Sequence, residues 1–408
     1  MGRKENFSSM MPYDRPVDLT NEGLFTAMQD KADERKSSGG AADNVSEDVG
    51  QQASILIRIL TMNRPEQLYN LLHSLETAKY ENDTVDIEIH IDVPLNASQQ
   101  SLDEHRDVLD VASRFEWIHG DKRIVDPGQH RGIFKMWVQP FIPRLSGQVL
   151  LVLEDDNQVS PDYYSWCKTL LEHIALYHDP KLYGFSLQRQ HSVIGISPTQ
   201  KYSWSFLDLR MDISKRLYRY QLLSSWGSIM FPTHWNNFVD WATEVKSNMP
   251  DFHPCIPYFI NNGWYNQGPT HIWTIWFNYY IYMHGLYSLY FNYAPYDKDG
   301  RYFSLLKNHR STGLHFNGSG GFIVARKVKK RAPDMQDKVE LLLEPPPKML
   351  LPPMSYNLYD FHFQFVPDPR VLDDRWRLMS GISDRCISNR PDKDFPSLTA
   401  GRKSNSTK

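Results

Sequence analysis

The stretch ILIRILTMNRPEQLYNLLHSLETAKYENDTVDIEIHID, residues 55–92, decides the fold. It opens with an apolar run rich in β-branched residues, which is typical of a buried strand. Leucines then recur at helical spacing after Pro65, which suits the first position of a helix, with Asn63 as the expected cap. Residues 85–92 alternate apolar and polar side chains and predict a second strand. Strand, helix and strand in this order predict a parallel sheet in an α/β protein.

Later segments extend the same pattern. Residues 98–115 and 130–141 predict two more helices, and residues 160–177 predict a helix that begins with Ser160 as cap. The continuous apolar run in QVLLVLEDD, residues 148–156, predicts a fully buried central strand. Residues 272–291 carry no charge, but they contain polar groups that would need partners in lipid. We therefore expect a buried helix that runs into a strand there, and no membrane span.

Three acidic residues, Glu154, Asp155 and Asp156, follow directly on the central strand. In open α/β sheets, ligands bind beyond the carboxyl ends of the strands, where buried carboxylates are costly without a partner. Mg²⁺ or Mn²⁺ would offset that cost, because hard cations prefer carboxylate oxygens and share them with substrate phosphates. The alternative is an acidic loop whose negative charges interact favourably with the dipole of the following helix. Asp92 also follows a strand, where it is either a contact to a ribose or base, or a loop cap.

Composition excludes several classes of function. A net charge of −3 gives no reason to expect nucleic acid binding. Three cysteines without metal-like spacing predict no disulfide framework, which suggests a reducing compartment or indifference to redox state. The N-terminus shows no apolar signal-peptide core. Neither a dinucleotide-binding glycine motif nor a P-loop follows the first strand, so those nucleotide folds are not indicated.

The opening unit with TMNRP and the segment LVLEDDNQVSPDYY resemble GT-A glycosyltransferases. The Glu-Asp-Asp triplet is similar to the metal motif of N-acetylglucosaminyltransferase I and its relatives, and PGQHRGIFKMW resembles the helix that lines their donor site. The resemblance covers about residues 54–320. It implies a GT-A fold, that is, a Rossmann-like, mostly parallel central sheet flanked by helices, with a C-terminal extension.

We expect three regions along the chain. Residues 1–52 are polar and form a disordered or stem-like arm. Residues 53–328 form the GT-A domain, with a nucleotide-binding half at 53–160 and an acceptor half at 161–328. Residues 329–408 contain a proline-rich linker and an extension whose aromatic residues pack back on the domain.

The resemblance also implies roles for individual residues. The implied metal ligands are Asp156 and His315, with Mn²⁺ or Mg²⁺ as the cofactor. The residues implied to bind the nucleotide sugar are Thr61, Asn63, Arg64, Asp92, Arg131, Lys135, Glu154, Asp155, Trp226 and Arg310. An aromatic platform for the acceptor is a further hypothesis for Trp226, Trp264, Trp273 and Trp276, with core packing as the alternative.

The predicted function is transfer of a sugar, of hexosyl or N-acetylhexosaminyl type, from a nucleotide-diphosphate donor to a hydroxyl of a glycan or glycoconjugate. A UDP-sugar is the favoured donor. An inverting enzyme needs a carboxylate base, but HIWTIWFNYY, where the family places it, has none. Asp251, Asp240 and Glu244 are the substitutes, although the last two suit a solvated helix face.

Two alternatives follow from that gap. One is a catalytically inactive GT-A-like protein that binds carbohydrate or a protein partner. The other is a metal-dependent nucleotidyltransferase or phosphotransferase, which normally has a glycine-rich phosphate loop that this chain lacks. The relatives work in the Golgi lumen behind a membrane anchor, so we expect either that compartment or the cytoplasm.

Overall fold

The structure is a computed structural model of the chain. It describes residues 54–177, 179–187, 217–223, 225–250, 252–256, 272–291, 302–304, 306–308, 339–341 and 353–373. The strands are β1 (Ile55–Thr61), β2 (Asp86–Ile91), β3 (Lys122–Val125), β4 (Val149–Glu154), β5 (Asn157–Val159), β6 (Leu182–Ser186), β7 (Leu217–Tyr220), β8 (Ser228–Met230), β9 (Tyr287–Phe291), β10 (Tyr302–Ser304), β11 (Leu306–Asn308), β12 (Val339–Leu341), β13 (Leu358–Tyr359) and β14 (Phe365–Val366). The α-helices are α2 (Pro65–Glu76), α3 (Gln99–Arg114), α4 (Gly132–Trp137), α5 (Tyr163–Ala175), α6 (Pro232–Asn248) and α7 (Trp273–Met283).

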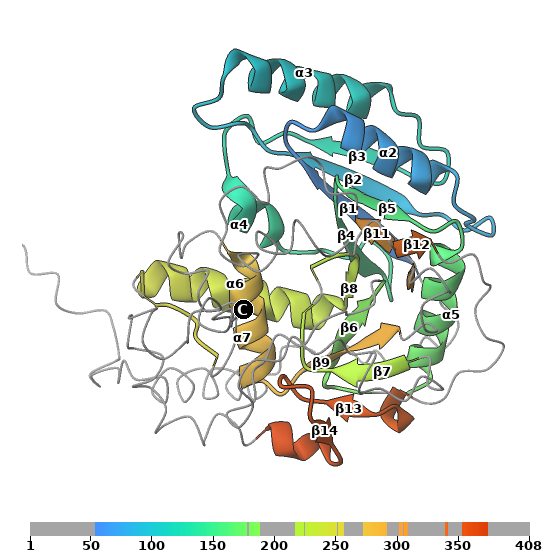
Figure 1. Ribbon diagram of the computed structural model, residues 1–408, viewed down its shortest axis with the longest axis vertical. Coiled ribbons are helices and arrows are strands. Elements are labelled where there is room, and N and C mark those ends of the chain that lie inside the picture. Colours follow the sequence, from blue (N-terminus) through green and yellow to red (C-terminus); the bar gives the residue numbers. More distant parts are fainter. Residues whose placement is uncertain are drawn as a thin grey trace, which may run out of the picture.

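A single large sheet organises the molecule (Figure 1). Within the described ranges its strand order is β14-β13-β7-β9-β6-β8-β4-β1-β2-β3. The run β4-β1-β2-β3 is parallel throughout, whereas β8 pairs antiparallel with both β4 and β6. The protein therefore has the predicted α/β architecture, with a mixed, mostly parallel central sheet flanked by helices.

Helices cover both faces of this sheet. Ile55, Ile57 and Ile59 of β1 point into a core shared with α2, α3 and α5. The alternate residues Leu56 and Leu60 point into a second core, shared with α4, α6 and α7. In Figure 1 these last three helices lie to the left of the sheet. Burial on both faces explains why the strand at 55–60 reads as a continuous apolar run.

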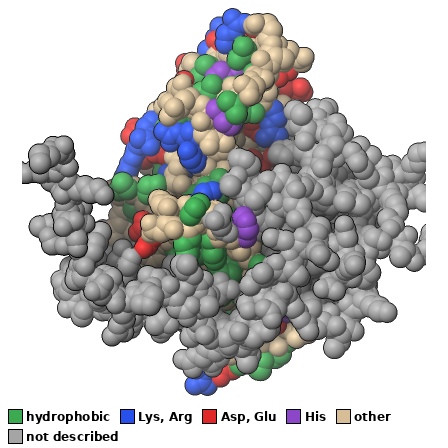
Figure 2. All heavy atoms as spheres, turned by 90° about the vertical axis from the view of Figure 1, so that its left-hand side faces the viewer, with side chains coloured by type: hydrophobic (Ala, Val, Ile, Leu, Met, Phe, Trp, Pro, Cys, Tyr) green, Lys and Arg blue, Asp and Glu red, His purple; other side chains and the backbone are tan. Residues whose placement is uncertain are grey.

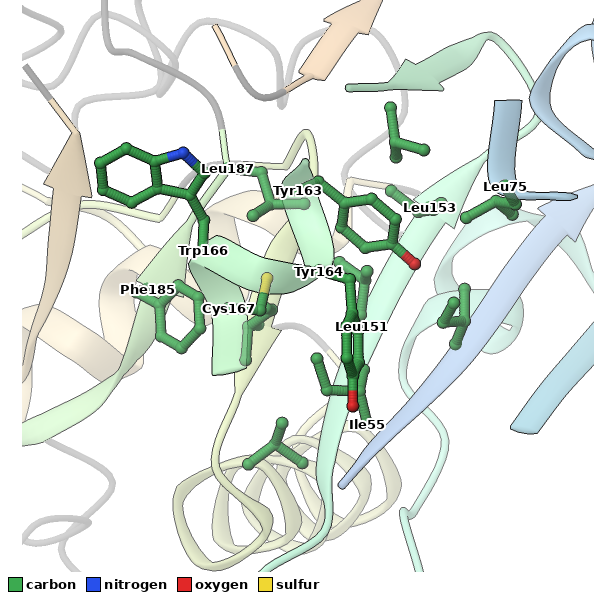
Figure 3. Close-up of a cluster of buried hydrophobic side chains, with 14 of the residues drawn as sticks. Ile55, Leu75, Leu151, Leu153, Tyr163, Tyr164, Trp166, Cys167, Phe185 and Leu187 are labelled. Carbon is green, nitrogen blue, oxygen red and sulfur yellow. The ribbon is translucent and has the colours of Figure 1, made fainter. Parts of the chain in front are cut away.

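The first core is densely aromatic where α5 crosses β4 and β6. Figure 3 shows Tyr163, Tyr164 and Trp166 of α5 beside Leu151 of β4 and Phe185 of β6. Each of these five side chains is almost fully buried. Burial of side chains this large stabilises the fold by roughly 1.5–3 kcal/mol each. This packing fixes β4, and with it the acidic triplet that follows.

The cysteines differ from expectation. Cys167 on α5 is free and buried in the core. Cys255, however, is disulfide-bonded. The expectation that the three cysteines form no disulfide is therefore wrong at Cys255. Disulfides are typical of proteins that fold in an oxidising compartment, so the finding counts against the reducing compartment that the cysteine count suggested.

Three helix boundaries differ from those predicted. The N-cap of α2 is Arg64, and the Asn63 side chain makes no cap hydrogen bond. The helix expected at 130–141 is α4, which ends at Trp137, before Pro140, where an α conformation is disfavoured. The helix expected from Ser160 begins at Tyr163, because the Ser160 hydroxyl accepts the Asp162 N–H in a turn before the helix.

The uncharged segment at 272–291 forms α7 and then β9, as predicted. Helix α7 is buried along its whole length between the sheet and α6, so its apolar surface faces protein. None of the helices in the described ranges is both long and apolar enough to cross a membrane.

The segment at 353–373 belongs to the core of the sheet. Strand β13 pairs parallel with β7, and β14 folds back on β13 as an antiparallel hairpin. Arg219 of β7 donates hydrogen bonds to the carbonyl oxygens of Tyr356 and Met354, at 3.0 Å each. The predicted arm at 1–52 and most of the predicted linker and tail at 329–408 lie outside the described residues.

Candidate functional site

The carboxyl ends of three parallel strands meet at one edge of the sheet. The Asp155 N–H donates to Leu60 O at 3.0 Å, and the Asp92 N–H donates to Thr61 O at 2.9 Å. The ends of β4, β1 and β2 are therefore level with one another. The chain turns from β1 to β2 on one side and reaches β4 on the other, so the edge between β1 and β4 is a topological switch point, where open α/β sheets bind ligands.

Asp155 lies at the centre of this edge and is buried, with 1% of its surface exposed. Its Oδ2 accepts a hydrogen bond from the Thr61 hydroxyl at 2.7 Å, and its Oδ1 pairs with the guanidinium of Arg64. Burial raises the pKa of the Asp155 carboxyl to about 6, although the charge of Arg64 and the Thr61 hydrogen bond oppose that rise.

Arg64 also reaches the next carboxylate. Its Nη1 lies 3.3 Å from Oδ2 of Asp156, whose Oδ1 accepts a hydrogen bond from the Asn157 amide at 3.2 Å. Burial on its own lowers the pKa of Arg64, but the neighbouring charges of Asp155, Asp156 and Glu154 outweigh it and raise that pKa. The arginine is therefore held as a cation between two carboxylates.

Glu154 faces the other side of the sheet. Its Oε1 accepts a hydrogen bond from the indole N–H of Trp137 at 3.1 Å. Burial, followed by the charge of Asp156, raises the pKa of Glu154 to about 8. Trp137 in turn stacks on Trp273 at the start of α7, with 4.0 Å between ring centroids. Glu154 thus connects the strand edge to the second half of the molecule.

Asp92 acts as an anchor for α4. Its carboxylate accepts hydrogen bonds from the backbone N–H groups of Arg131 at 2.7 Å and Gly132 at 2.9 Å. His130 Nδ1 lies 3.4 Å from the same carboxylate. Gly132 has φ +74°, a left-handed conformation that favours glycine. Asp92 therefore makes the cap-like contacts that were one of its two predicted roles.

Asn63 is turned toward α3. Its amide donates to the Ser101 hydroxyl at 2.9 Å and to Glu104 at 3.3 Å. A ring nitrogen of His105 lies 2.8 Å from Met62 O. These contacts fix the turn between β1 and α2, and so the backbone from which Arg64 reaches the acidic residues.

Two further predicted cations lie on α4. Arg131 and Lys135 are exposed. The side of the molecule that carries α4, α6 and α7 faces the viewer in Figure 2, and Lys and Arg side chains gather on its described surface.

The second half contributes fewer of the predicted residues. Asp240 and Glu244 are exposed on α6. Trp226 is half-buried against the first core, whereas Trp273 and Trp276 are each only 3% exposed. The last two belong to the core, so the acceptor-platform hypothesis is wrong for them. Asp251, Trp264, His309, Arg310 and His315 lie outside the described residues.

One strand from the second half reaches the acidic triplet. Strand β11 pairs antiparallel with β5, so that Asn308 lies opposite Asn157. Asn157 follows Asp156 directly. The chain around residue 308 is therefore brought to the same edge as the triplet.

Trp137 is the contact that the sequence analysis missed. Its indole N–H binds Glu154 from the last position of α4. A signal was available, because a buried indole N–H normally finds a polar acceptor, and the acidic triplet is the nearest run of acceptors along the chain.

The carboxylates fit a hard divalent cation, although they form no complete cage. Across the ranges that the structure describes, no group of three His, Cys, Asp or Glu side chains is placed to hold a metal ion. Two buried acids, Asp155 and Asp156, nevertheless pair with one guanidinium, and burial raises the pKa values of Glu154 and Asp155. Mg²⁺ sites typically use one or two carboxylates and complete their shell with water and substrate phosphates. Asp156, with a carboxylate partner, meets that requirement.

Comparisons with known proteins give partial matches to solved structures and no match to a protein family. No protein-family model matches the sequence, and no curated protein sequence matches it significantly. Among solved structures, the chain is similar to a mannosyltransferase, PcManGT from Pyrobaculum calidifontis, in complex with GDP-mannose and Mn²⁺, at 12% identity and a TM-score of 0.24, covering 41% of this chain and 44% of that one. It is also similar to residues 1–349 of TarS from S. aureus, at 11% identity and a TM-score of 0.27, covering 45% of this chain and 48% of that one. Less than half of this chain and less than half of each of those two chains are matched.

Proposed function

We propose that this protein is a glycosyltransferase that uses a nucleoside-diphosphate sugar, with a UDP-sugar favoured, and a divalent cation, Mn²⁺ or Mg²⁺. The observation that carries the proposal is the buried acidic triplet at the carboxyl end of β4, beside the ends of β1 and β2. Buried carboxylates are costly, and this edge of the sheet is where α/β proteins bind ligands. The acceptor is a hydroxyl of a glycan or glycoconjugate.

The residues at the edge would divide the work of binding the donor. Asp156 would hold the cation, which acts as a Lewis acid on the departing diphosphate. The exposed cations Arg131 and Lys135 would add charge to the diphosphate from α4. Arg310, two residues along the chain from Asn308, which pairs opposite Asn157, is a further candidate cation for the diphosphate. His315 remains a candidate second metal ligand.

Transfer also requires a base if the reaction inverts the anomeric carbon. The acceptor oxygen would bond to that carbon, the bond to the diphosphate oxygen would break, and a carboxylate would take the hydroxyl proton. Asp251 is our first candidate for this role, with Asp240 and Glu244 after it. The exposed positions of the last two make them accessible to an acceptor.

Two observations favour the second candidate function, a GT-A-like protein that binds carbohydrate or a partner without catalysis. Arg64 neutralises part of the acidic triplet, as a structural ion pair does. In addition, α7 contains no carboxylate. A disulfide at Cys255 favours the Golgi lumen over the cytoplasm for either function.

Calorimetry with UDP and GDP, with and without Mn²⁺, tests the proposal. We expect UDP to bind at least about tenfold more tightly with Mn²⁺, because each 1.4 kcal/mol of metal–phosphate interaction gives tenfold in affinity. Asp156→Ala should abolish that gain. Asp121→Ala, which removes an exposed acid just before β3 at the opposite edge, is the matched control.

Release of UDP from a panel of UDP-sugars, measured with Mn²⁺ present, then separates the two candidates. Metal-dependent hydrolysis or transfer supports the enzyme. Metal-dependent binding of UDP without turnover of any sugar supports the binding protein. Binding of UDP that is the same with and without Mn²⁺ in both wild type and Asp156→Ala contradicts the proposal.

A further inference from the structure

Arg64 occupies the position at which a cation would meet the acidic triplet. It lies three residues after the end of β1 and directly before Pro65, the first residue of α2, so its backbone is held between two regular elements. From there its guanidinium pairs with Oδ1 of Asp155 and lies 3.3 Å from Oδ2 of Asp156. A guanidinium that joins two successive carboxylates uses the same oxygens that a divalent cation would use.

The burial of the three side chains is unequal. The Asp155 side chain is 0% exposed and that of Asp156 is 5% exposed, whereas that of Arg64 is 21% exposed. The carboxylates are fixed from behind by the Thr61 hydroxyl and the Asn157 amide. The arginine is therefore the most solvent-exposed of the three side chains.

The guanidinium compensates only part of the charge. Glu154, Asp155 and Asp156 carry three negative charges when ionised, and Arg64 supplies one positive charge. A divalent cation in the same place would compensate more of it and would suit the hard oxygen ligands better. An arginine released from the pair would in turn find a matching partner in a diphosphate, since its planar fork binds phosphate oxygens two at a time.

We propose that Arg64 is a built-in counter-cation, which holds Asp155 and Asp156 together before metal binds, leaves these oxygens to a divalent cation, and then binds the diphosphate of the donor. This inference rests on the proposed function. Arg64 would then compete with the metal for the carboxylate oxygens of Asp155 and Asp156, and it would strengthen the binding of the nucleotide. Removal of the guanidinium should therefore change the two affinities in opposite directions, which a purely structural ion pair would not do.

The test uses Arg64→Gln in the full chain and titrates Mn²⁺ alone, by calorimetry and by the shift of the thermal unfolding midpoint. We expect the variant to bind Mn²⁺ at least about tenfold more tightly than wild type, and to gain more thermal stability from it, because ligand binding stabilises the folded state in proportion to affinity. A second titration with UDP at saturating Mn²⁺ should show about tenfold weaker binding by the variant. Unchanged or weaker Mn²⁺ binding overturns the proposal, as does unchanged UDP binding.

Two further variants keep the test decisive. Arg144→Ala removes an arginine that pairs with Asp86 at the amino end of β2, on the opposite edge of the sheet, and should change neither affinity. If Arg64→Gln does not fold without metal, Arg64→Lys keeps one charge but loses the fork. It should then show an intermediate gain in Mn²⁺ affinity, and equal or weaker Mn²⁺ binding than wild type overturns the proposal.

The outcomes also separate this inference from the proposed function. Tighter Mn²⁺ binding by Arg64→Gln, with no nucleoside diphosphate bound by wild type, supports the competition at the triplet but contradicts both the donor and the later role of Arg64. Metal-dependent UDP binding by wild type, with no gain in Mn²⁺ affinity in the variant, leaves the function standing and overturns the exchange.

Discussion

Glu88 shows how the polar side of a strand is buried in this protein. It lies on β2 and is 4% exposed. Its carboxylate pairs with Arg58 of β1 at 3.4 Å and with Arg123 of β3 at 2.5 Å, and it lies 3.1 Å from Nε2 of His90. Burial on its own would raise the pKa of Glu88, but the His90 hydrogen bond and the two arginines outweigh it and lower that pKa to about 2.

This cluster predicts a loss of stability in acid. A carboxyl group whose pKa is lowered in the folded state stabilises the fold above its unfolded pKa, and that contribution is lost as the pH falls through its folded pKa. For Glu88 the window extends from about pH 4.5 down to about pH 2. Urea unfolding across this window should show that wild type loses roughly 3 kcal/mol more than Glu88→Gln, from ~1.4 kcal/mol per pKa unit.

At neutral pH the Glu88→Gln variant should be the less stable protein, because Arg58 keeps its buried charge and loses its carboxylate partner. The two stability curves should therefore converge in acid. Glu76→Gln, which removes an exposed carboxylate at the end of α2, controls for the loss of one charge. Curves that remain parallel from pH 5 to pH 2 would contradict this account of the cluster.

The residue pattern of β2 also marks a limit of the sequence. The alternation at 85–92 correctly predicts that Val85, Ile87, Ile89 and Ile91 share one face, and all four are buried in the first core. It suggests that the opposite face is exposed, yet Glu88 and His90 on that face are buried as well. Their partner Arg58 is 30 residues from Glu88 along the chain, so local periodicity cannot reveal the pairing.

At the scale of elements, α4 is held at both ends by residues of the strands. Asp92 accepts the N–H groups of Arg131 and Gly132 at its start. After its end, Arg58 donates to Gln139 O at 3.4 Å and Pro140 O at 3.3 Å. A helix of six residues is too short to be stable by itself, so these contacts, together with its buried apolar side chains, fix its position.

Asp92→Ala should therefore release the first turn of α4. We expect the amide hydrogens of Arg131 and Gly132 to exchange with solvent at least about tenfold faster, and the free energy of unfolding to fall by roughly 1–3 kcal/mol, because several charge-assisted hydrogen bonds are lost. Hydrogen exchange followed by NMR or mass spectrometry measures both. As a control, Asp126→Ala removes a carboxylate in the loop before α4 that accepts the Gly128 N–H at 2.8 Å, and it should leave the α4 amides unchanged. Equal protection of these amides in both variants would show that Asp92 does not anchor the helix.

The elements that were predicted well are those with a strong local signal. Strands β1, β2 and β4 and helices α2 and α3 appear close to their predicted bounds, because apolar periodicity, Ser98 as a cap and Pro65 as a helix start all act locally. Strand β3 was missed, since its four residues at the sheet edge are half-buried or exposed and form no apolar run. At the site, the resemblance implied one common donor site for Thr61, Asp92 and Asp155, but no local pattern shows that Arg64 pairs with the acids. The contact between Trp137 and Glu154 was missed, although a buried indole N–H was a signal for it.

At the scale of the whole molecule, the sheet is continuous from β3 to the C-terminal segment at 353–373. Strand β8 joins β4 to β6, and β7 joins β9 to β13. The segment at 353–373 contributes Phe361 and Phe363 to the same core that contains α6 and α7. Helix α7 begins at Trp273, which stacks on Trp137, and Trp137 donates a hydrogen bond to Glu154. This core is therefore in contact with the candidate site.

Phe361→Ala tests whether this segment is an integral part of the fold. Phe361 is 1% exposed, so its truncation should leave a cavity and lower the free energy of unfolding by roughly 3–5 kcal/mol. Phe365→Ala, four residues further along the same hairpin, removes a side chain that is 58% exposed and should change stability by less than about 0.5 kcal/mol. Chemical denaturation followed by tryptophan fluorescence compares the two variants. Because the core that Phe361 joins contains five buried tryptophans, Trp137, Trp235, Trp241, Trp273 and Trp276, a cooperative loss at lower denaturant in Phe361→Ala alone is expected. Equal midpoints for both variants would mean that the segment is only loosely attached.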